Sequence, residues 1–327
     1  MKIIIILIAA VLAVILGLNV YLLANFYQGM RRAEKEWQQF IPQKMTGLGN
    51  IKSLEFLPLI DWFADRDDLK REPGGSYLIK TEKNSILFDV GLNGRQKDPS
   101  PLLHNMKQLG VSLNDFDTIV ISHNHLDHVG GMRWQRERSF SLTSRQIDLG
   151  EKVVYTPVPM TYPNLTSVYV KEPVIIAEGV ASIGTIPNQL FLGGWTPEQA
   201  LAVNVEGKGI ILIIGCGHQT LPKIFKRTET LFDEPIYGII GGLHYPVTDS
   251  RIKIFGIKAQ RYVGTDRPPW RPINMSDVRK NIEELKKRNP KIVRLSAHDS
   301  CDVSIAEFRR AFSDAFDEIR VGKKIII

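Results

Sequence analysis

The sequence predicts a mixed α/β fold in which two sheets pack face to face with helices outside, preceded by an apolar helix. Two pairs of short alternating segments, 76–81 with 85–90 and 200–205 with 209–214, have the pattern of antiparallel hairpins. Helical patterns interrupt the later strands without regular strand–helix alternation, so the sheets must contain antiparallel as well as parallel neighbours. Helices are expected at residues 101–109, 221–232, 276–288 and 304–316.

The N-terminal segment is long enough to cross a bilayer. Residues 3–26 are apolar except for one glycine and two asparagines. At about 1.5 Å per residue, a helix of this length spans the ~30 Å hydrocarbon core. No small-residue cleavage site follows, which favours a retained anchor over a cleaved signal peptide. We therefore expect a transmembrane anchor at 1–30, a juxtamembrane linker that begins as an amphipathic helix at 31–50, and the folded domain at 51–327.

The flanking charges leave the orientation of this anchor open. Arg31, Arg32 and Lys35 outnumber Lys2, which favours a cytosolic domain. A short tail with one lysine is nevertheless also common on anchors that export their domain. The expected partner on either side is the lipid bilayer.

Composition limits the remaining classes. The 327 residues, 43% hydrophobic and 24% charged, can form one large buried core. The net charge of +7 suits an anionic substrate or an anionic membrane face. Basic residues are scattered without aromatic alternation, so no nucleic-acid partner is predicted. Two cysteines, Cys216 and Cys301, provide no disulfide framework.

The most informative motif is Ser-His-Asn-His-Leu-Asp-His-Val-Gly-Gly at residues 122–131. Imidazole and carboxylate groups are the ligands that zinc prefers, and iron or manganese also accept them. On an extended loop, His123 and His125 point the same way and can hold one ion. Asp127 and His128 follow at an expected helix start and face a neighbouring position. The spacing therefore predicts two metals side by side.

Three further histidines close strand patterns. His218, His244 and His298 each follow an apolar, β-branched run, where a buried strand opens into a loop. Ligands collected from several strand ends are what a rigid two-metal pocket requires. His104, by contrast, is expected in a surface helix.

These motifs together resemble a known family. His-x-His-x-Asp-His-x-Gly-Gly, followed by Gly-Cys-Gly-His, Gly-Gly-Leu-His and a late Ala-His-Asp, resembles the metallo-β-lactamase-fold hydrolases. The Gly-Cys-x-His and Gly-Gly-x-His pair is similar to the branch named for the dihydropterin ribofuranosylaminobenzene phosphate synthases. The resemblance covers roughly residues 51–327 and implies a four-layer αββα sandwich. It also implies that Asp89 supports the metal loop from behind the ligands.

Two sets of three ligands are then expected. The first ion is held by His123, His125 and His218, and the second by Asp127, His128 and His298. The resemblance implies that Cys216 contacts metal, although a buried small side chain is an equal alternative. Two ions per chain, zinc first and iron or manganese as alternatives, make up the expected cofactor.

This arrangement predicts a hydrolase in which a metal-bound water attacks an ester, lactone or phosphodiester. Asp127 is expected to act as ligand and proton acceptor. His244 is open between a ligand, a donor that orients the substrate and a proton carrier. Two other functions remain: a di-iron oxidoreductase on the same scaffold, and a non-catalytic metal-binding module on a membrane.

One segment fits no core element. Residues 248–275 carry Arg251, Arg261 and Arg267 together with several prolines. A long segment without periodicity inside a compact domain is usually functional or disordered. We expect it either to cover the pocket or to form a surface excursion.

Overall fold

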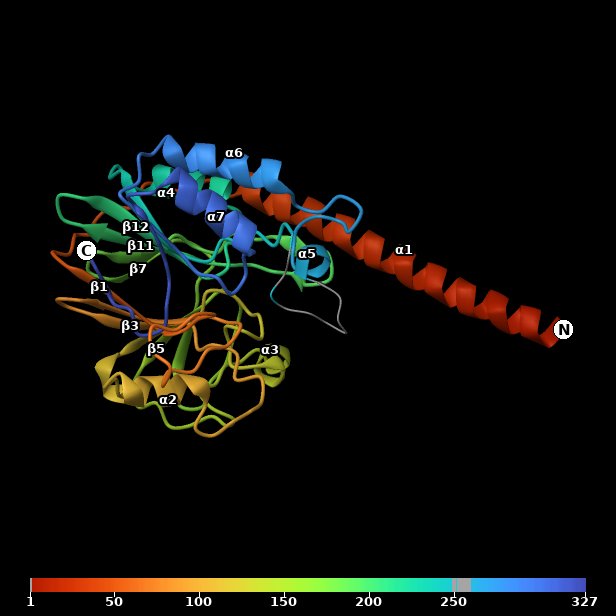
Figure 1. Cartoon of the computed structure of the whole chain (residues 1–327), viewed down its shortest axis with the longest axis horizontal. Coiled ribbons are helices and arrows are strands. Elements are labelled where there is room, and N and C mark those ends of the chain that lie inside the picture. The colour runs from red at the N-terminus through yellow and green to blue at the C-terminus, as the bar shows by residue number, and fades with distance from the viewer. Residues whose placement is uncertain (1, 249–250, 252–259) are drawn as a thin grey trace.

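The computed structural model describes residues 2–248, 251 and 260–327. Two seven-stranded sheets lie face to face, and helices cover the outer face of each (Figure 1). This is the four-layer αββα sandwich expected from the sequence. A single long helix projects from one end of the sandwich.

The first sheet contains the metal-loop strand and is mostly built from the N-terminal half of the domain. Its order is β16-β1-β2-β3-β4-β5-β6, with parallel pairing from β3 to β6. The strands are β16 Ile325–Ile326, β1 Leu54–Ile60, β2 Ser76–Thr81, β3 Ser85–Phe88, β4 Thr118–Val120, β5 Val153–Thr156 and β6 Thr166–Tyr169.

The second sheet supplies the other histidines. Its order is β15-β14-β13-β12-β11-β8-β7, and β12 to β15 are parallel. The strands are β15 Phe316–Glu318, β14 Ile292–Leu295, β13 Ile236–Gly241, β12 Gly209–Ile214, β11 Leu201–Val205, β8 Val180–Ser182 and β7 Val174–Ala177. A small separate hairpin pairs β9 (Gln189–Leu190) with β10 (Gly194–Trp195). Both hairpins predicted from the sequence, β2–β3 and β11–β12, are confirmed.

Each sheet is covered by its own set of helices. α2 (Pro101–Gln108), the short helix η1 (Leu113–Asp115) and α3 (Met132–Glu137) belong with the first sheet. α4 (Leu221–Leu231), α6 (Met275–Lys286) and α7 (Asp302–Ala311) cover the second, and α5 (Gln260–Val263) lies nearer the projecting helix. Between the sheets, residues such as Phe56, Phe88, Leu201 and Ile213 are fully buried in one apolar layer. That layer fixes the two sheets against each other and so fixes their loops.

Two predicted helix bounds are wrong. The last helix ends at Ala311, because Phe316 pairs with Val293 in the sheet as the first residue of β15. The metal loop also does not pass directly into a helix. Gly130 and Gly131 have φ angles of 90° and 120°, which a helix cannot contain, so α3 begins only at Met132.

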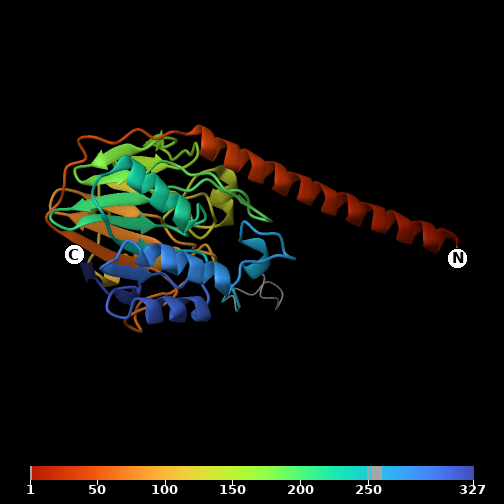
Figure 2. The ribbon, with the colours of Figure 1, turned by 90° about the horizontal axis from the view of Figure 1, so that it is seen from above.

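The N-terminal helix α1 (Lys2–Gln39) is continuous through the apolar run and beyond it. Its apolar part projects away from the domain (Figure 2) and is long and apolar enough to span a membrane. Its second half lies on the domain, where Phe26 and Ala33 are 2% exposed. The predicted boundary between anchor and linker, at residues 30 and 31, therefore lies within one uninterrupted helix.

Candidate metal centre

The metal loop leaves β4 and turns sharply, so that its four ligand-type side chains are shared between two adjoining groups. The backbone N–H groups of His128 and Val129 both donate to the His125 carbonyl, at 3.0 and 3.2 Å. Gly130 then passes so close to the Ser141 carbonyl that a Cβ would lie 2.2 Å from its oxygen. Only glycine allows this approach, which directs the loop back across the end of the sheet.

Three histidine rings form the first group. His123 lies with its ring centroid 4.6 Å from that of His125 and 5.0 Å from that of His218. His125 and His218 are 4.8 Å apart. The Nε2 atom of His123 and the Nδ1 atom of His218 are buried without a hydrogen-bond partner among the described residues. Buried imidazole nitrogens without partners are costly unless something else binds them, as a metal ion would.

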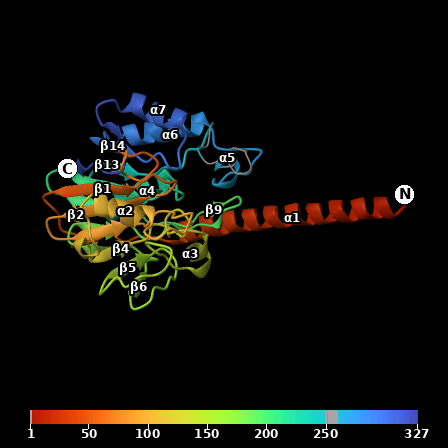
Figure 3. The ribbon, with the colours of Figure 1, turned by 60° about the horizontal axis from the view of Figure 1, so that its bottom comes forward.

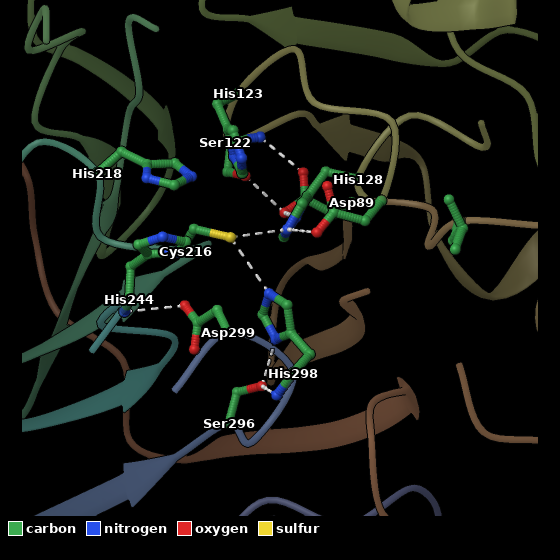
Figure 4. A network of polar contacts seen from close by, with 12 residues as sticks. Asp89, Ser122, His123, His128, Cys216, His218, His244, Ser296, His298 and Asp299 are labelled. Carbon is green, nitrogen blue, oxygen red and sulfur yellow. Dashed lines mark hydrogen bonds and ion pairs between the residues drawn. The ribbon is translucent and has the colours of Figure 1, made fainter. Parts of the chain in front are cut away.

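A second group lies directly beside the first. Ligand atoms of Asp127, His128, Cys216 and His298 all lie within 4.8 Å of one another. The Cys216 Sγ atom lies 3.1 Å from Nε2 of His128 and 3.2 Å from Nε2 of His298 (Figure 4). Cys216 also lies within ligand distance of His123 and His218. The thiol therefore lies between the two groups, where it can serve either ion.

Polar residues behind the ligands fix the orientation of the rings. The Asp89 carboxylate accepts from Nδ1 of His128 at 2.7 Å, and from the Ser122 hydroxyl at 2.6 Å. That hydroxyl lies 2.9 Å from Nδ1 of His123, and the Ser296 hydroxyl lies 2.5 Å from Nδ1 of His298. In all three rings Nδ1 has a hydrogen-bond partner behind the ring, and Nε2 points to the centre. This is the usual geometry of metal-ligating histidines. Asp89 thus has the supporting place that the resemblance implied.

Three supporting carboxylates were not found from the sequence. Glu198 accepts the backbone N–H groups of Cys216, Gly217 and His218 at 2.7 to 2.9 Å. Asp299 accepts the N–H of His244 at 3.0 Å, and Asp61 accepts the Ser296 hydroxyl at 2.7 Å. Glu198 and Asp61 lie in segments without any motif. Asp299 directly follows His298, and that adjacency was the only available signal.

The electrostatics of the centre are those of a site built for cations. Four carboxylates, those of Asp61, Asp89, Glu198 and Asp299, are at most 2% exposed. Burial raises the pKa of Asp61 to about 6 and that of Glu198 to about 7, and raises the pKa of Asp299 well above its ordinary value. Burial also lowers the pKa of most of the histidines, to about 4 for His125. Neutral imidazoles and crowded carboxylates favour bound cations, because buried anions are costly unless they are paired.

The pKa of His128 is shifted in the opposite direction from that of the other histidines in the centre. Burial lowers its pKa, but the carboxylates of Asp89 and Asp127 outweigh burial and raise the pKa to about 9. Without a metal, this ring therefore carries the proton that balances the neighbouring carboxylates.

His244 lies at the edge of the centre. Its ring centroid is 4.4 Å from that of His218, and both of its ring nitrogens lack a partner among the described residues. Its φ angle is 50°, a left-handed conformation that is uncommon for a residue with a side chain. A ligand atom of His244 lies within 4.8 Å of Cys216 and Asp299, so the geometry permits both a ligand and a substrate-side role.

Two cavities open onto the centre, and both have the second half of α1 as a wall. The larger, of about 700 Å³, reaches His125 and Thr196. The smaller, of about 380 Å³, reaches His218 and His244. Gly264, Thr265 and Arg267 from the described part of 248–275 line the smaller cavity, so this part of the segment does border the pocket.

Arg251 from the same segment has its hydrogen bonds within the protein. It donates to the carbonyls of Ala297 and Ser300 and forms an ion pair with Asp302. Most of the remainder of 248–260 lies outside the described residues.

Comparisons with known proteins agree with this geometry. The family described as the metallo-β-lactamase superfamily matches residues 69–140, which include the metal loop. The structure superposes on Tm1679, a metal-dependent hydrolase of the β-lactamase superfamily, with a TM-score of 0.56 at 18% identity, over 83% of this chain and 98% of that one. It also superposes on the metallo-β-lactamase fold protein YhfI from Bacillus subtilis, with a TM-score of 0.51 at 12% identity, over 84% and 100%. The chain has the metallo-β-lactamase fold.

A more particular likeness is to one curated enzyme. The 7,8-dihydropterin-6-methyl-4-(β-D-ribofuranosyl)-aminobenzene-5′-phosphate synthase of Methanocaldococcus jannaschii is 22% identical, over 68% of this chain and 88% of the relative. This is the branch that the Gly-Cys-x-His and Gly-Gly-x-His motifs indicated.

Proposed function

We propose that this protein is a membrane-anchored, dinuclear metal-dependent hydrolase of an ester, lactone or phosphodiester. One observation carries the proposal: side chains from the ends of strands in both sheets converge on two adjoining ligand groups. Five histidines, Asp127 and Cys216 make up these groups, and Asp127 and Cys216 each lie within ligand distance of residues in both. A structural zinc needs only four protein ligands, so a larger set with open cavities beside it favours catalysis over a purely structural role.

The residues fit two divalent ions, with zinc as the first choice. His123, His125 and His218 would hold one ion, while Asp127, His128 and His298 would hold the other. Cys216 would contact either. When bound, such ions lower the pKa of a water molecule and polarise the oxygen of the scissile group.

The chain's own residues would do the rest. Asp127 is partly exposed and lies 3.7 Å from Nε2 of His128, where it can accept a proton as well as bind a metal. His244 would orient the substrate or carry a proton at the edge of the smaller cavity. α1 would keep the enzyme at the bilayer, with the side of the membrane left open by the flanking charges.

The test combines metal analysis with a substrate screen. Purified full-length protein should contain about two transition-metal ions and hydrolyse an ester or phosphodiester reporter such as bis(p-nitrophenyl) phosphate. Asp127→Ala should lose about one metal and the activity while remaining folded, because the lost group is a loop ligand and not a core side chain. Asp117→Ala, an exposed aspartate before the same loop, is the control. One metal or none in active protein would contradict the dinuclear site, and redox activity with iron would support the oxidoreductase alternative.

A further inference from the structure

The anchor helix contacts the domain without any spacer. Phe26 is the last residue of the apolar run and is already 2% exposed, and Leu22 and Leu23 before it are half-buried. The Phe26 ring lies edge-on against Phe191, at the tip of the β9–β10 hairpin, with centroids 5.3 Å apart. If residues 3–26 span the bilayer, the hairpin tip must lie at the bilayer surface.

The surface around this exit has the composition of a membrane interface. Phe191 contacts Trp270 edge-on at 6.0 Å, and Trp270 is 62% exposed. Leu192, at the tip of the hairpin, is 52% exposed. Exposed tryptophan beside a spanning helix is typical of the headgroup layer. Figure 3 shows α3, α5 and β9 grouped at the end of the domain from which α1 departs, so the loops that follow the metal motif face the same way.

The larger cavity joins this face to the metal centre. It is lined by Arg32 from α1, by Phe40 directly after that helix, by His125 from the metal loop, and by Arg138, Lys171 and Arg227. Four of its lining side chains are arginine or lysine, and Glu36 is the single acidic one, itself paired with Arg32 at 2.8 Å. A cavity with this excess of positive charge attracts an anionic group.

Arg227 gives an independent indication of an anion. Its side chain is 2% exposed and packs on the Phe40 ring, with the guanidinium 4.2 Å from the ring centroid. One amino group donates to the Ile183 carbonyl, while the Nε atom has no partner and no described carboxylate pairs with it. A buried guanidinium without a counter-ion is costly, and a bound anion would offset that cost.

We propose that the cavity between α1 and the metal loop binds the anionic phosphate headgroup of a bilayer lipid, whose acyl chains remain in the membrane. This inference rests on the proposed hydrolase and makes its substrate a membrane-embedded amphiphile. Arg227 and Lys171 neutralise the phosphate, and His125 marks the end of the cavity where the lipid headgroup meets the metal centre. The hairpin tip and Trp270 hold this opening at the bilayer surface.

The test measures lipid binding separately from hydrolysis. Full-length protein is reconstituted in phosphatidylcholine vesicles that contain a photoreactive phosphatidylglycerol, and labelled peptides are mapped by mass spectrometry. Labelling should fall on the cavity-lining part of α1 and be competed by unlabelled phosphatidylglycerol in the vesicle. Arg227→Met should reduce labelling about tenfold or more, as expected for the loss of a buried charge-assisted contact.

Three variants make the result decisive. Arg227→Lys should retain most of the labelling because it keeps the charge. Arg288→Met is the matched control, since Arg288 also stacks 4.2 Å above a phenylalanine ring, that of Phe225, but does not line the larger cavity. Lys171→Gln, at an exposed position, should lower labelling even if Arg227→Met fails to fold.

The outcomes separate the two proposals. Equal labelling of the wild type and of a folded Arg227→Met protein, or of the wild type and Lys171→Gln, would overturn the lipid site. Equal competition by soluble glycerol phosphate would show that a free phosphate, and not a lipid, is the ligand. Labelling as expected without hydrolysis of any ester, lactone or phosphodiester reporter would instead contradict the proposed hydrolase and leave the lipid site intact.

Discussion

At the scale of single residues, the centre depends on hydrogen bonds behind the ligand-type side chains, of which the resemblance implied only the support from Asp89. His123 and His128 are held through Ser122 and Asp89, so the carboxylate of one residue sets the orientation of two rings. Asp89 has a φ angle of 60°, which places its side chain beneath the metal loop. The cluster of ligands was predictable from the sequence because ligand chemistry and spacing are local properties. The supports at Asp61 and Glu198 were not, because they come from distant segments that approach only in the folded protein.

His244 is the residue whose role the geometry leaves most open, and substitution can decide it. We expect His244→Ala to lower kcat by about 10² to 10⁴, as the loss of a proton-transfer group does, while metal content stays near two. The reason is that, in the proposed site, each ion would already have three other protein ligands. Metal analysis and steady-state kinetics check this, with His104→Ala on α2 as the control, since His104 contacts the Asp68 carbonyl and lies in no ligand group. Loss of one metal equivalent would make His244 a ligand.

The raised pKa of His128 predicts a pH dependence for the metal-free protein. Its folded-state pKa of about 9 lies above the ordinary value of 6.5, so the stability from its proton is complete below pH 6.5 and lost as the pH rises through 9. Glu198, whose pKa is raised to about 7, also lowers the stability of the folded state as the pH rises through 7. The histidines whose pKa is lowered are already neutral in both states above pH 6.5 and do not oppose the effect. The Cys301 thiol does oppose it, because burial raises its pKa but hydrogen bonds from Ser304 and Thr248 outweigh burial and lower it to about 7. Its thiolate therefore adds stability as the pH rises from 7 to 9.

In Cys301→Ser protein, which lacks the opposing thiol, the expected result is a loss of a few kcal/mol between pH 7 and pH 9.5 after treatment with a chelator. Metal-loaded protein should change much less, because its ligand histidine is neutral throughout. Chemical denaturation of both forms across this range measures the difference. A metal-free protein with equal stability at both pH values would show that His128 is not the proton-holding group.

At the scale of elements, the strands were easier to predict than the loops between them. Alternation and apolar runs gave β2, β3, β11 and β12 because burial on one or both faces leaves a pattern in the sequence. The β9–β10 hairpin left no such pattern, since it contains only four paired residues and packs mainly on α1. The association of that hairpin with the second half of α1, which forms the walls of both cavities, is a tertiary contact that local sequence does not encode.

Substitution of Gly29 tests the packing of α1 on the β9–β10 hairpin. A Cβ at Gly29 would lie 2.1 Å from Oε1 of Gln189 in β9, so a larger side chain must displace the buried Gln189 side chain or move the helix away from the hairpin. We expect Gly29→Leu to destabilise the domain by about 1–3 kcal/mol, as overpacking does. Gly17→Leu is the matched control, because Gly17 lies in the same helix with nothing within 4 Å. Thermal unfolding in detergent compares the two, and equal melting temperatures would show that α1 does not pack on β9 as described.

At the scale of the whole molecule, α1 is both an apolar helix and part of the domain surface. Beyond Phe26 it contributes an ion pair between Glu34 and Lys223 and the Trp37 ring beneath Arg227. The sequence alone separated these roles into an anchor, a linker and a domain that begins at residue 51. In the structure, residues 30–40 line both cavities and Trp37 lies against Arg227, so we expect removal of residues 1–50 to uncover Arg227 and open both cavities.

Truncation therefore predicts two distinct losses. The full chain should stay in membranes through alkaline carbonate washing, whereas chains that begin at Asn25 or at Ile51 should both be released. Both truncated chains should still bind about two metals, because every expected ligand lies after residue 122. The chain that begins at Asn25 should melt several degrees higher, since burial of Phe26, Ala33 and Trp37 stabilises by a few kcal/mol.

The two losses are distinct because membrane insertion depends on the apolar run, whereas the stability of the domain depends on the half of α1 that follows it. Release of the full chain by the wash, or a mature N-terminus near Gln28, would overturn the retained anchor and leave the metal centre unaffected. Equal melting temperatures of the two truncated chains would contradict the packing of α1 instead. Because the first outcome concerns residues 3–26 and the second residues 25–50, membrane retention and packing on the domain are tested separately.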